Sequence, residues 1–183
     1  MRKVLVIGSG GAGKSTFARR LGESLGLPVV HLDSCYWKPG WVEPPKDVWL
    51  KTVEGLLARD EWVMDGNYSD TLNVRLAACD TVIFLDLPRL VCLWGIVSRW
   101  LRWRGRTRPD MTAGCPERLT WEFVRWVWTY PAERRPKVLA RLRALEARGE
   151  KRVLVVRSRR EARRLPARLA QESESAAAGA PVD

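Results

Sequence analysis

Histidine, clustered cysteines and long apolar runs are scarce or missing in this chain of 183 residues. His31 is its one histidine, and its four cysteines stand far apart, at Cys35, Cys79, Cys92 and Cys115. Zinc sites use ligands in paired clusters, so this spacing argues against a zinc protein. Isolated thiols are typical of a reducing compartment. No run of eighteen apolar residues occurs, so we expect no membrane span.

A basic-then-apolar leader is not expected either, because residues 1–7 are too short for one and lead into a glycine-rich stretch. These absences favour a cytoplasmic protein. Acidic residues are few beside basic ones, with 21 Asp and Glu against 32 Lys and Arg and a formal net charge of +11. Such a surface attracts polyanions whatever their sequence. Three explanations stay open: weak nonspecific nucleic acid binding, nucleotide phosphates in an arginine-lined cleft, and solvated arginines.

Strand and helix patterns alternate along the chain. Apolar, β-branched runs predict strands at 4–7, 27–33, 61–65, 81–86 and 152–156. Apolar residues at helical spacing predict helices at 14–25, 46–59, 87–103, 117–130 and 158–170, with another helix running on to residue 148. This order predicts an α/β fold of three α/β/α layers around a five-stranded, mostly parallel sheet. Ligands of such sheets bind at the carboxyl ends of the strands.

We predict a single domain over residues 1–170. Within it, residues 34–60 form an insertion suited to an acceptor, and this insertion opens with the Pro/Gly/aromatic loop "SCYWKPGWVEPP". Residues 99–116 form an arginine-rich, lid-like segment. Residues 171–183, "QESESAAAGAPVD", are predicted to be a disordered tail because they carry few apolar side chains.

The stretch "GSGGAGKS" at residues 8–15 fits the P-loop pattern G-x-x-x-x-G-K-[ST] between a strand and a helix. Glycines let the backbone take positive φ and approach an anion, while the amides and the helix N-terminus attract phosphate. Lys14 is expected at the β- and γ-phosphates and the Ser15 hydroxyl on Mg²⁺. The spacing does not fit a dinucleotide fingerprint, so we predict ATP. The predicted ATP-binding residues are Gly8, Gly10, Gly11, Ala12, Gly13, Lys14, Ser15 and Thr16.

Three aspartates each end a predicted strand: Asp33, Asp65 and Asp86. Asp65 is the predicted metal-side acid with Ser15, because its strand is expected beside the first one and Mg²⁺ is held partly through ordered waters. Asp33 is predicted to receive the proton of an acceptor hydroxyl or to bind the substrate. Helix capping is an alternative for each of the three, and for Asp86 it has the stronger claim.

The stretch "RWLRWRGRTRPD" at residues 99–110 packs five arginines into ten residues. Guanidinium forks suit phosphate oxygens and stabilise the charge that spreads in phosphoryl transfer, and Arg99, Arg106 and Arg108 are the predicted catalytic arginines. A solvated basic loop, or a nucleic acid grip using the interleaved tryptophans, is the alternative. Further on, Trp121 and Trp128 share a helical face, which favours core packing or a homodimer interface over base stacking.

The stretches "GSGGAGKST", "HLD…YWKPGW", "DGNYS", "RGRTRPDM", "GCPE" and "YP…RRPK" together resemble the adenylate-kinase-like group of P-loop kinases, and more closely the topology modulation (FlaR-related) proteins. The resemblance spans residues 1–160. It implies that Gly13, Lys14 and Ser15 hold ATP and Mg²⁺ and that Asp65 is the acid of the "DG" turn. It further implies that Arg99 to Arg108 contact phosphate in a lid, and that Arg157 lies near the adenine.

The chain departs from adenylate kinases where they bind a nucleoside monophosphate. "NYS" follows the "DG" turn where they carry an arginine, and "SCYWKPGW" follows the second strand where they carry another. Arg75 is a possible replacement clamp. We therefore predict a Mg²⁺-dependent kinase that transfers the γ-phosphate of ATP to a nucleotide-like or other hydroxyl or phosphate acceptor. The alternative is an ATP-regulated nucleic-acid-binding protein that affects DNA topology. No N-K-x-D guanine motif occurs, which weakens a GTPase interpretation.

Overall fold

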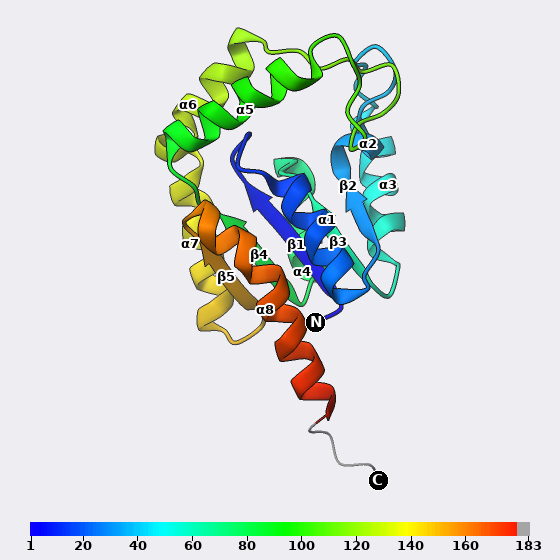
Figure 1. Cartoon of the computed structure of the whole chain (residues 1–183). Helices are drawn as coiled ribbons and strands as arrows, with labels where there is room; N and C mark the ends of the chain where they lie inside the picture. The colour runs from blue at the N-terminus through cyan, green and yellow to red at the C-terminus, as the bar shows by residue number, and fades with distance from the viewer. Residues whose placement is uncertain (179–183) are drawn as a thin grey trace.

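Five strands form one sheet in the order β2-β3-β1-β4-β5, and every pairing is parallel (Figure 1). The computed structural model describes residues 1–178. The strands are β1 (Lys3–Gly8), β2 (Val29–His31), β3 (Trp62–Asp65), β4 (Thr81–Leu85) and β5 (Arg152–Val156). The predicted α/β class and five-stranded sheet are confirmed.

Helices cover both faces of the sheet (Figure 1). One face carries α1 (Lys14–Leu25) and α8 (Arg159–Ala178), and the other carries α3 (Lys46–Leu57), α4 (Leu72–Ala78) and α7 (Arg135–Ala147). The remaining helical elements are α2 (Leu32–Tyr36), the short 3₁₀ turn η1 (Ser69–Thr71), α5 (Arg89–Trp103) and α6 (Trp121–Glu133). In Figure 1, α5, α6 and the loop between them arch over the carboxyl end of the sheet.

The central residues of the strands are apolar because each face of the sheet is buried against a separate core. Successive side chains of a strand point to opposite faces. Val4 and Val6 accordingly pack with α1 and α8, whereas Leu5 and Ile7 pack with α3 and α4. Burying one such side chain contributes about 1.5–3 kcal/mol. The apolar runs therefore specify a sheet covered on both sides, with its strand ends left for a ligand.

Several predicted boundaries were wrong. The loop predicted over residues 34–45 begins inside α2, and α4 was not predicted because it is short and places a charged residue, Arg75, on its buried face. The predicted helix at 117–130 begins later, where the Thr120 hydroxyl caps α6 by accepting a hydrogen bond from the Phe123 amide at 3.3 Å.

The C-terminal prediction also needs correction. Helix α8 is continuous through Pro166 and extends to Ala178, so the predicted disorder is wrong for residues 171–178. Gln, Glu and Ala dominate that stretch, and all three are good helix formers. The rest of the predicted tail, residues 179–183, lies outside the described residues.

Core packing, one of the two roles predicted for Trp121 and Trp128, is wrong, and the homodimer interface stays a prediction. Trp121 is 74% exposed and Trp128 is 51% exposed, whereas Val127 and Tyr130 of the same helix are buried. The buried face of α6 therefore carries Val127 and Tyr130, and the face with Trp121 and Trp128 points to solvent.

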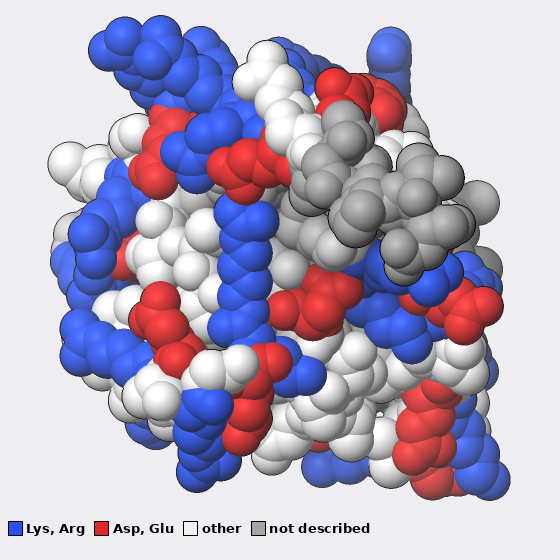
Figure 2. Space-filling model, turned by 90° about the horizontal axis from the view of Figure 1, so that it is seen from below, with Lys and Arg blue, Asp and Glu red and all other residues white. Residues whose placement is uncertain are grey.

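Basic side chains are spread over the surface. On the face drawn in Figure 2, the Lys and Arg groups are separated by Asp, Glu and uncharged groups, so they do not merge into one basic stripe there. No helix within residues 1–178 is both long and apolar enough to cross a membrane.

Candidate active site

A cavity of about 790 Å³ lies at the carboxyl ends of the strands. Its walls come from the P-loop, the loops after β2 and β3, α5, the segment between α5 and α6, and the start of α6. Of the residues predicted for the site, the cavity is lined by Gly10, Gly11, Gly13, Lys14, Ser15, Thr16, Asp33, Asp65, Arg99 and Arg108. The sheet edge predicted to bind a ligand is therefore where the cavity lies.

The P-loop needs glycine at Gly11. Its φ is +74°, in the left-handed region, and a Cβ there would lie 2.0 Å from the Cys92 carbonyl oxygen of α5. A Cβ on Gly95 of α5 would lie 2.1 Å from the Gly11 carbonyl oxygen. Helix α5 thus packs directly on the P-loop backbone, a contact that the loop motif alone does not reveal.

Lys14, Ser15 and Asp65 lie together at the floor of the cavity. The Lys14 ammonium donates a hydrogen bond to the Ser9 carbonyl oxygen at 3.0 Å, and the Ser15 hydroxyl donates to Asp65 Oδ2 at 2.9 Å. Burial lowers the pKa of Lys14, while the charges of Asp33 and Asp65 oppose that shift. The structure thus brings Lys14, Ser15 and Asp65 together, and their roles toward phosphate and Mg²⁺ stay predictions.

His31 is bonded to the same carboxylate. The parallel register of β2 and β3 sets His31 opposite Asp65, and the His31 Nδ1 atom contacts Asp65 Oδ1. Burial of the ring lowers the pKa of His31, but the hydrogen bond and the charge of Asp65 outweigh it and raise that pKa above its ordinary value. Asp65, only 4% exposed, is thus fixed through both of its oxygens.

The turn after β3 is tied to the P-loop by Asn67. Its side-chain amide donates to the Gly8 carbonyl oxygen at 2.7 Å and accepts from the Gly8 amide at 3.2 Å. This paired contact holds the "DGNY" turn against the start of the P-loop. An amide side chain can both donate and accept these hydrogen bonds. This explains Asn67 at the position after the "DG" turn, where the resemblance to adenylate kinases would place an arginine.

Arg75 supports the same turn from the protein interior. The prediction that Arg75 clamps the acceptor is therefore wrong. Its side chain is fully buried and donates hydrogen bonds to the backbone carbonyl oxygens of residues 66, 67, 68 and 71, including Gly66 at 2.9 Å. Burial lowers its pKa to about 10, so it stays charged at neutral pH. Arg75 therefore acts as a fixed cationic cap for carbonyl groups that water does not reach.

Replacing Arg75 with methionine is expected to lower the free energy of unfolding by about 3 kcal/mol, because several buried carbonyl groups lose their donors. Denaturant unfolding followed by circular dichroism measures this. Arg141→Met, at an exposed position of α7, is the matched control and is expected to change the value by about 0.5 kcal/mol or less. A loss of equal size in both variants would contradict the cap.

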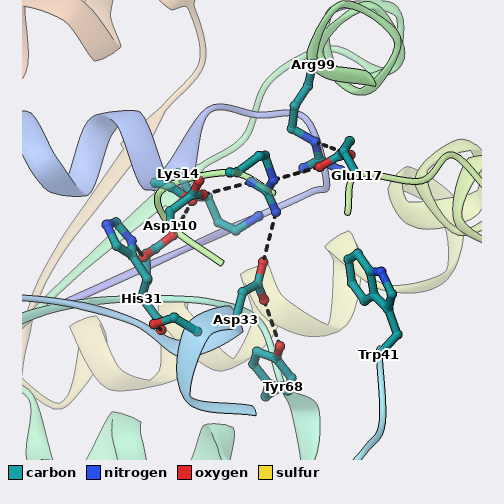
Figure 3. Close-up of polar contacts among 12 residues, drawn as sticks. Lys14, His31, Asp33, Trp41, Tyr68, Arg99, Asp110 and Glu117 are labelled. Carbon is teal, nitrogen blue, oxygen red and sulfur yellow. Dashed lines mark hydrogen bonds and ion pairs between the residues drawn. The ribbon is translucent and has the colours of Figure 1, made fainter. Parts of the chain in front are cut away.

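Asp33 lies at the acceptor side of the cavity, at the start of α2. The Tyr68 hydroxyl donates to Asp33 Oδ1 at 2.7 Å, and Arg108 Nη2 is 3.9 Å from Asp33 Oδ2 (Figure 3). Burial and the charge of Asp33 raise the pKa of Tyr68, so this hydroxyl stays a donor. The Asp33 side chain is 41% exposed. One carboxylate edge is thus held in place while the residue remains open to a ligand.

Glu117 joins Arg99 and Arg108, two of the arginines that line the cavity (Figure 3). Its Oε1 is 2.9 Å from Arg99 Nε, its Oε2 is 2.7 Å from Arg108 Nε, and its side chain is only 2% exposed. Arg108 also donates to Asp110 Oδ2 at 2.8 Å. Burial lowers the pKa of Arg99, as does the charge of Arg108, while Glu117 opposes both. The lid arginines are thus held in one network.

The lid-like segment contacts the loop after β2 through backbone and side-chain hydrogen bonds. The Gly40 amide donates to the Gly114 carbonyl oxygen at 2.9 Å, and the Thr112 hydroxyl donates to the Ser34 carbonyl oxygen at 2.9 Å. The Trp41 indole N–H donates to the Pro116 carbonyl oxygen at 3.0 Å. The two segments predicted to serve the nucleotide and the acceptor therefore form one continuous cover over the cavity.

Four predicted site residues do not line this cavity, namely Gly8, Ala12, Arg106 and Arg157. Arg106 is exposed, and only its backbone takes part, by accepting a hydrogen bond from the Glu117 amide. Arg157 lines a separate pocket beside Asp86, while Arg159, two residues later, lines the main cavity. Asp86 itself pairs with Arg135 through both oxygens, at 2.6 and 2.8 Å. The predicted helix cap at Asp86 is wrong, because the N-cap of α5 is Pro88 and no side chain caps that helix.

Sequence patterns missed other residues of the cavity. Asn67, Tyr68 and Asp110 line the cavity and stood in quoted motifs without a predicted role. Glu117, which contacts two arginines of the cavity wall, was expected at the start of a helix. Asn67 and Tyr68 carried a signal, since they follow a strand-end "DG". Asp110 and Glu117 acquire their roles only because the chain between α5 and α6 folds back over the sheet.

The fold has solved counterparts. Shikimate kinase from Acinetobacter baumannii, in complex with shikimate, matches with a TM-score of 0.54 and 19% identity over 96% of this chain and 94% of that chain. Shikimate kinase from Aquifex aeolicus matches with a TM-score of 0.51 and 17% identity over 97% of this chain and 99% of that chain. No family model matches the chain, and no curated protein matches it. At these identities the likeness shows the fold alone, an α/β fold that this chain shares with the two kinases.

The residues at the cavity floor fit a magnesium nucleotide. The P-loop residues Gly13, Lys14 and Ser15 line the cavity, and the Ser15 hydroxyl lies beside the Asp65 carboxylate. Mg²⁺ keeps several waters and takes one or two protein oxygens in nucleotide sites, which matches the pair formed by Ser15 and Asp65. In the described part of the chain, no group of three or more His, Cys, Asp or Glu side chains forms a protein-only metal cage.

Proposed function

We propose that the protein is a Mg²⁺-dependent kinase that transfers the γ-phosphate of ATP to a hydroxyl group of a small molecule. The observation that carries the proposal is that the P-loop and Asp33 line one cavity, with Lys14 and Arg108 also in its wall. A phosphate cradle, a carboxylate and fixed cations are the parts that phosphoryl transfer requires. The likeness of the fold to shikimate kinases supports it.

Each group has a role in this reaction. Lys14 and the P-loop amides bind the β- and γ-phosphates, and Ser15 with Asp65 holds Mg²⁺, which when bound neutralises phosphate charge. Asp33 takes the proton of the acceptor hydroxyl as the new O–P bond forms and the bond from the γ-phosphorus to ADP breaks. Arg99 and Arg108 stabilise charge on the transferred group.

The nucleotide base has a place in the same cavity. Arg159 at the start of α8 lines the cavity, as does Gly95 of α5, and the Arg159 guanidinium donates a hydrogen bond to the Val91 carbonyl oxygen of α5 at 3.2 Å. We propose that the adenine lies beside Arg159, which takes the place predicted for Arg157. The likeness to topology modulation proteins, the cytoplasmic location, homodimer formation and weak nucleic acid binding remain predictions from sequence.

Asp33→Asn is expected to lower phosphoryl transfer by about 100-fold, because the amide accepts no proton at neutral pH. Transfer is measured with γ-labelled ATP and a pool of small hydroxyl compounds, and MgATP affinity is measured by calorimetry. MgATP affinity is expected to change little. Asp60→Asn, at an exposed turn after α3, is the matched control.

Two results would count against the proposal. Absence of MgATP binding by the unmodified protein removes the nucleotide half of it. Transfer by Asp33→Asn at the rate of the Asp60 control removes the assigned base and leaves the nucleotide site standing.

A further inference from the structure

Two aromatic residues at the acceptor end of the cavity have left-handed backbones. Within residues 1–178, positive φ outside glycine occurs at Trp41, with φ +64°, and at Tyr68, with φ +32°. Bulky side chains are rarely found in this region because the Cβ crowds the backbone, and such strain concentrates at functional sites. Trp41 and Tyr68 come from different loops, yet both line the same cavity. The strain therefore points to a use for these two rings.

The rings belong to a cluster that is fixed from several sides. The ring centroids of Trp37 and Trp41 are 5.2 Å apart in an edge-to-face arrangement, and Tyr68 lies 4.6 Å from Tyr36 and 5.1 Å from Trp49. The lid holds Trp41 through its indole N–H, and Figure 3 shows Asp33, Tyr68 and Trp41 at one end of the site. Trp37 and Trp41 thus offer a rigid aromatic wall beside the proposed base.

The cations at this end are already engaged. Arg108 faces three carboxylates, those of Asp33, Asp110 and Glu117. Arg75 donates its hydrogen bonds to backbone carbonyl groups. Arg118 also lines the cavity, but its guanidinium is exposed and lies over the Trp41 ring, 4.5 Å from the ring centroid, in a cation–π contact. Recognition of a carboxylate or phosphate on the acceptor calls for a free, inward guanidinium fork. The carboxylates of Asp33 and Asp110 instead accept hydrogen bonds from hydroxyls and repel anions.

We propose, on the basis of the function proposed above, that the acceptor is an uncharged ring polyol of the monosaccharide or cyclitol class. Its C–H face packs on Trp37 and Trp41, because aromatic rings provide large apolar contact area at a fixed angle. One hydroxyl donates to Asp33 and becomes the attacking group, and another donates to Asp110. This sets the acceptor apart from shikimate, a carboxylate, which is bound in the structurally similar kinase from Acinetobacter baumannii.

Matched pairs of probes test the charge preference. Glucose against glucose 6-phosphate and myo-inositol against its monophosphate are titrated into the protein with MgADP, followed by tryptophan fluorescence, and are then tested for label transfer from ATP. Shikimate completes the panel. The neutral members are expected to bind and accept phosphate, and the anionic members to bind about 10-fold more weakly or worse. The proposal is overturned if any anionic member binds more tightly than the neutral members. It is also overturned if none of the neutral members binds at millimolar concentration.

Trp41→Gly tests the aromatic wall. Glycine adopts positive φ freely, so the change removes the ring without adding backbone strain, and the unfolding midpoint is expected to fall only modestly as the indole hydrogen bond to Pro116 is lost. Affinity for the neutral polyol selected above is expected to fall about 10-fold, with MgATP affinity unchanged. Trp94→Ala, 60% exposed on α5 and outside the cavity wall, is the control and is expected to change neither.

These outcomes separate the two proposals. If the unmodified protein binds no MgATP, the proposed kinase function fails. If it binds MgATP and a polyol but Trp41→Gly binds the polyol equally well, the kinase function stands and the aromatic wall is refuted.

Discussion

Replacing Lys14 with methionine is expected to lower phosphoryl transfer from MgATP by about 1,000-fold, the range in which fixed cationic and hydrogen-bonding groups contribute to such reactions. Methionine keeps an unbranched stem of similar length and removes only the charge. In the structure the Lys14 ammonium lies inside the loop, 3.0 Å from the Ser9 carbonyl oxygen. Few waters compete with it there, so its interaction with a developing phosphate charge is strong.

The measurement is a single-turnover assay with γ-labelled ATP, alongside calorimetry with MgADP and MgATP. Affinity for MgATP is expected to fall more than affinity for MgADP, because the ammonium reaches the γ-phosphate. Lys51→Met, at an exposed position of α3, is the matched control and is expected to leave both readings unchanged. A loss smaller than about 10-fold in the Lys14 variant would show that this loop does not do the work of a P-loop.

Sequence patterns predicted the sheet and the nucleotide half of the site because both depend on neighbouring residues. Each strand buries both faces, so it is apolar throughout and easy to recognise, and β1, β3 and β4 lie within a residue or two of their predicted bounds. The P-loop glycines and Lys14 are adjacent in the chain. Only the packing of Gly95 against Gly11 was out of reach, since it joins residues 84 positions apart through tertiary contact.

The acceptor half was predicted less well because it is assembled across the chain. Asp33, Tyr68 and Arg108 come from three separate loops, and their contacts depend on the lid folding onto residues 34–41. Arg75 shows the same limit in another way. A charged residue in a short helix looks like a surface residue, and its burial follows from the carbonyl groups of a turn that it supports.

The lid arginines could not be ranked from sequence. Arg99, Arg106 and Arg108 have the same side chain and similar neighbours, yet Arg106 is exposed while Arg108 is 7% exposed. The difference lies in Glu117. Its carboxylate pairs with Arg99 and Arg108, whereas Arg106 meets only the backbone amide of Glu117, through the Arg106 carbonyl oxygen. A buried guanidinium needs a paired partner, so the position of the acid decides which arginines enter the site.

Glu117→Gln is expected to lower phosphoryl transfer by about 1,000-fold, because both site arginines lose the carboxylate that orients them and each such arginine is worth a large factor. Glutamine keeps the volume of the side chain and removes its charge. The change also leaves two buried cations with one fewer counter-charge, so the free energy of unfolding is expected to fall by about 3 kcal/mol. In the proposed reaction Glu117 touches no substrate and acts as a positioning residue for Arg99 and Arg108.

A measurement that does not respond to a loss of stability alone can tell whether Glu117 positions Arg99 and Arg108 or only stabilises the lid. MgADP with aluminium fluoride mimics the transferring phosphoryl group, so its affinity reports on Arg99 and Arg108, whereas MgADP alone reports on the P-loop. Glu117→Gln is expected to weaken the fluoride complex by about 100-fold while MgADP affinity stays within about 3-fold. Glu117→Asp is expected to restore part of the loss, and Glu146→Gln, exposed on α7, to have no effect. Equal weakening of both complexes would mean that Glu117 only holds the lid together, and that Arg99 and Arg108 find the phosphate without it.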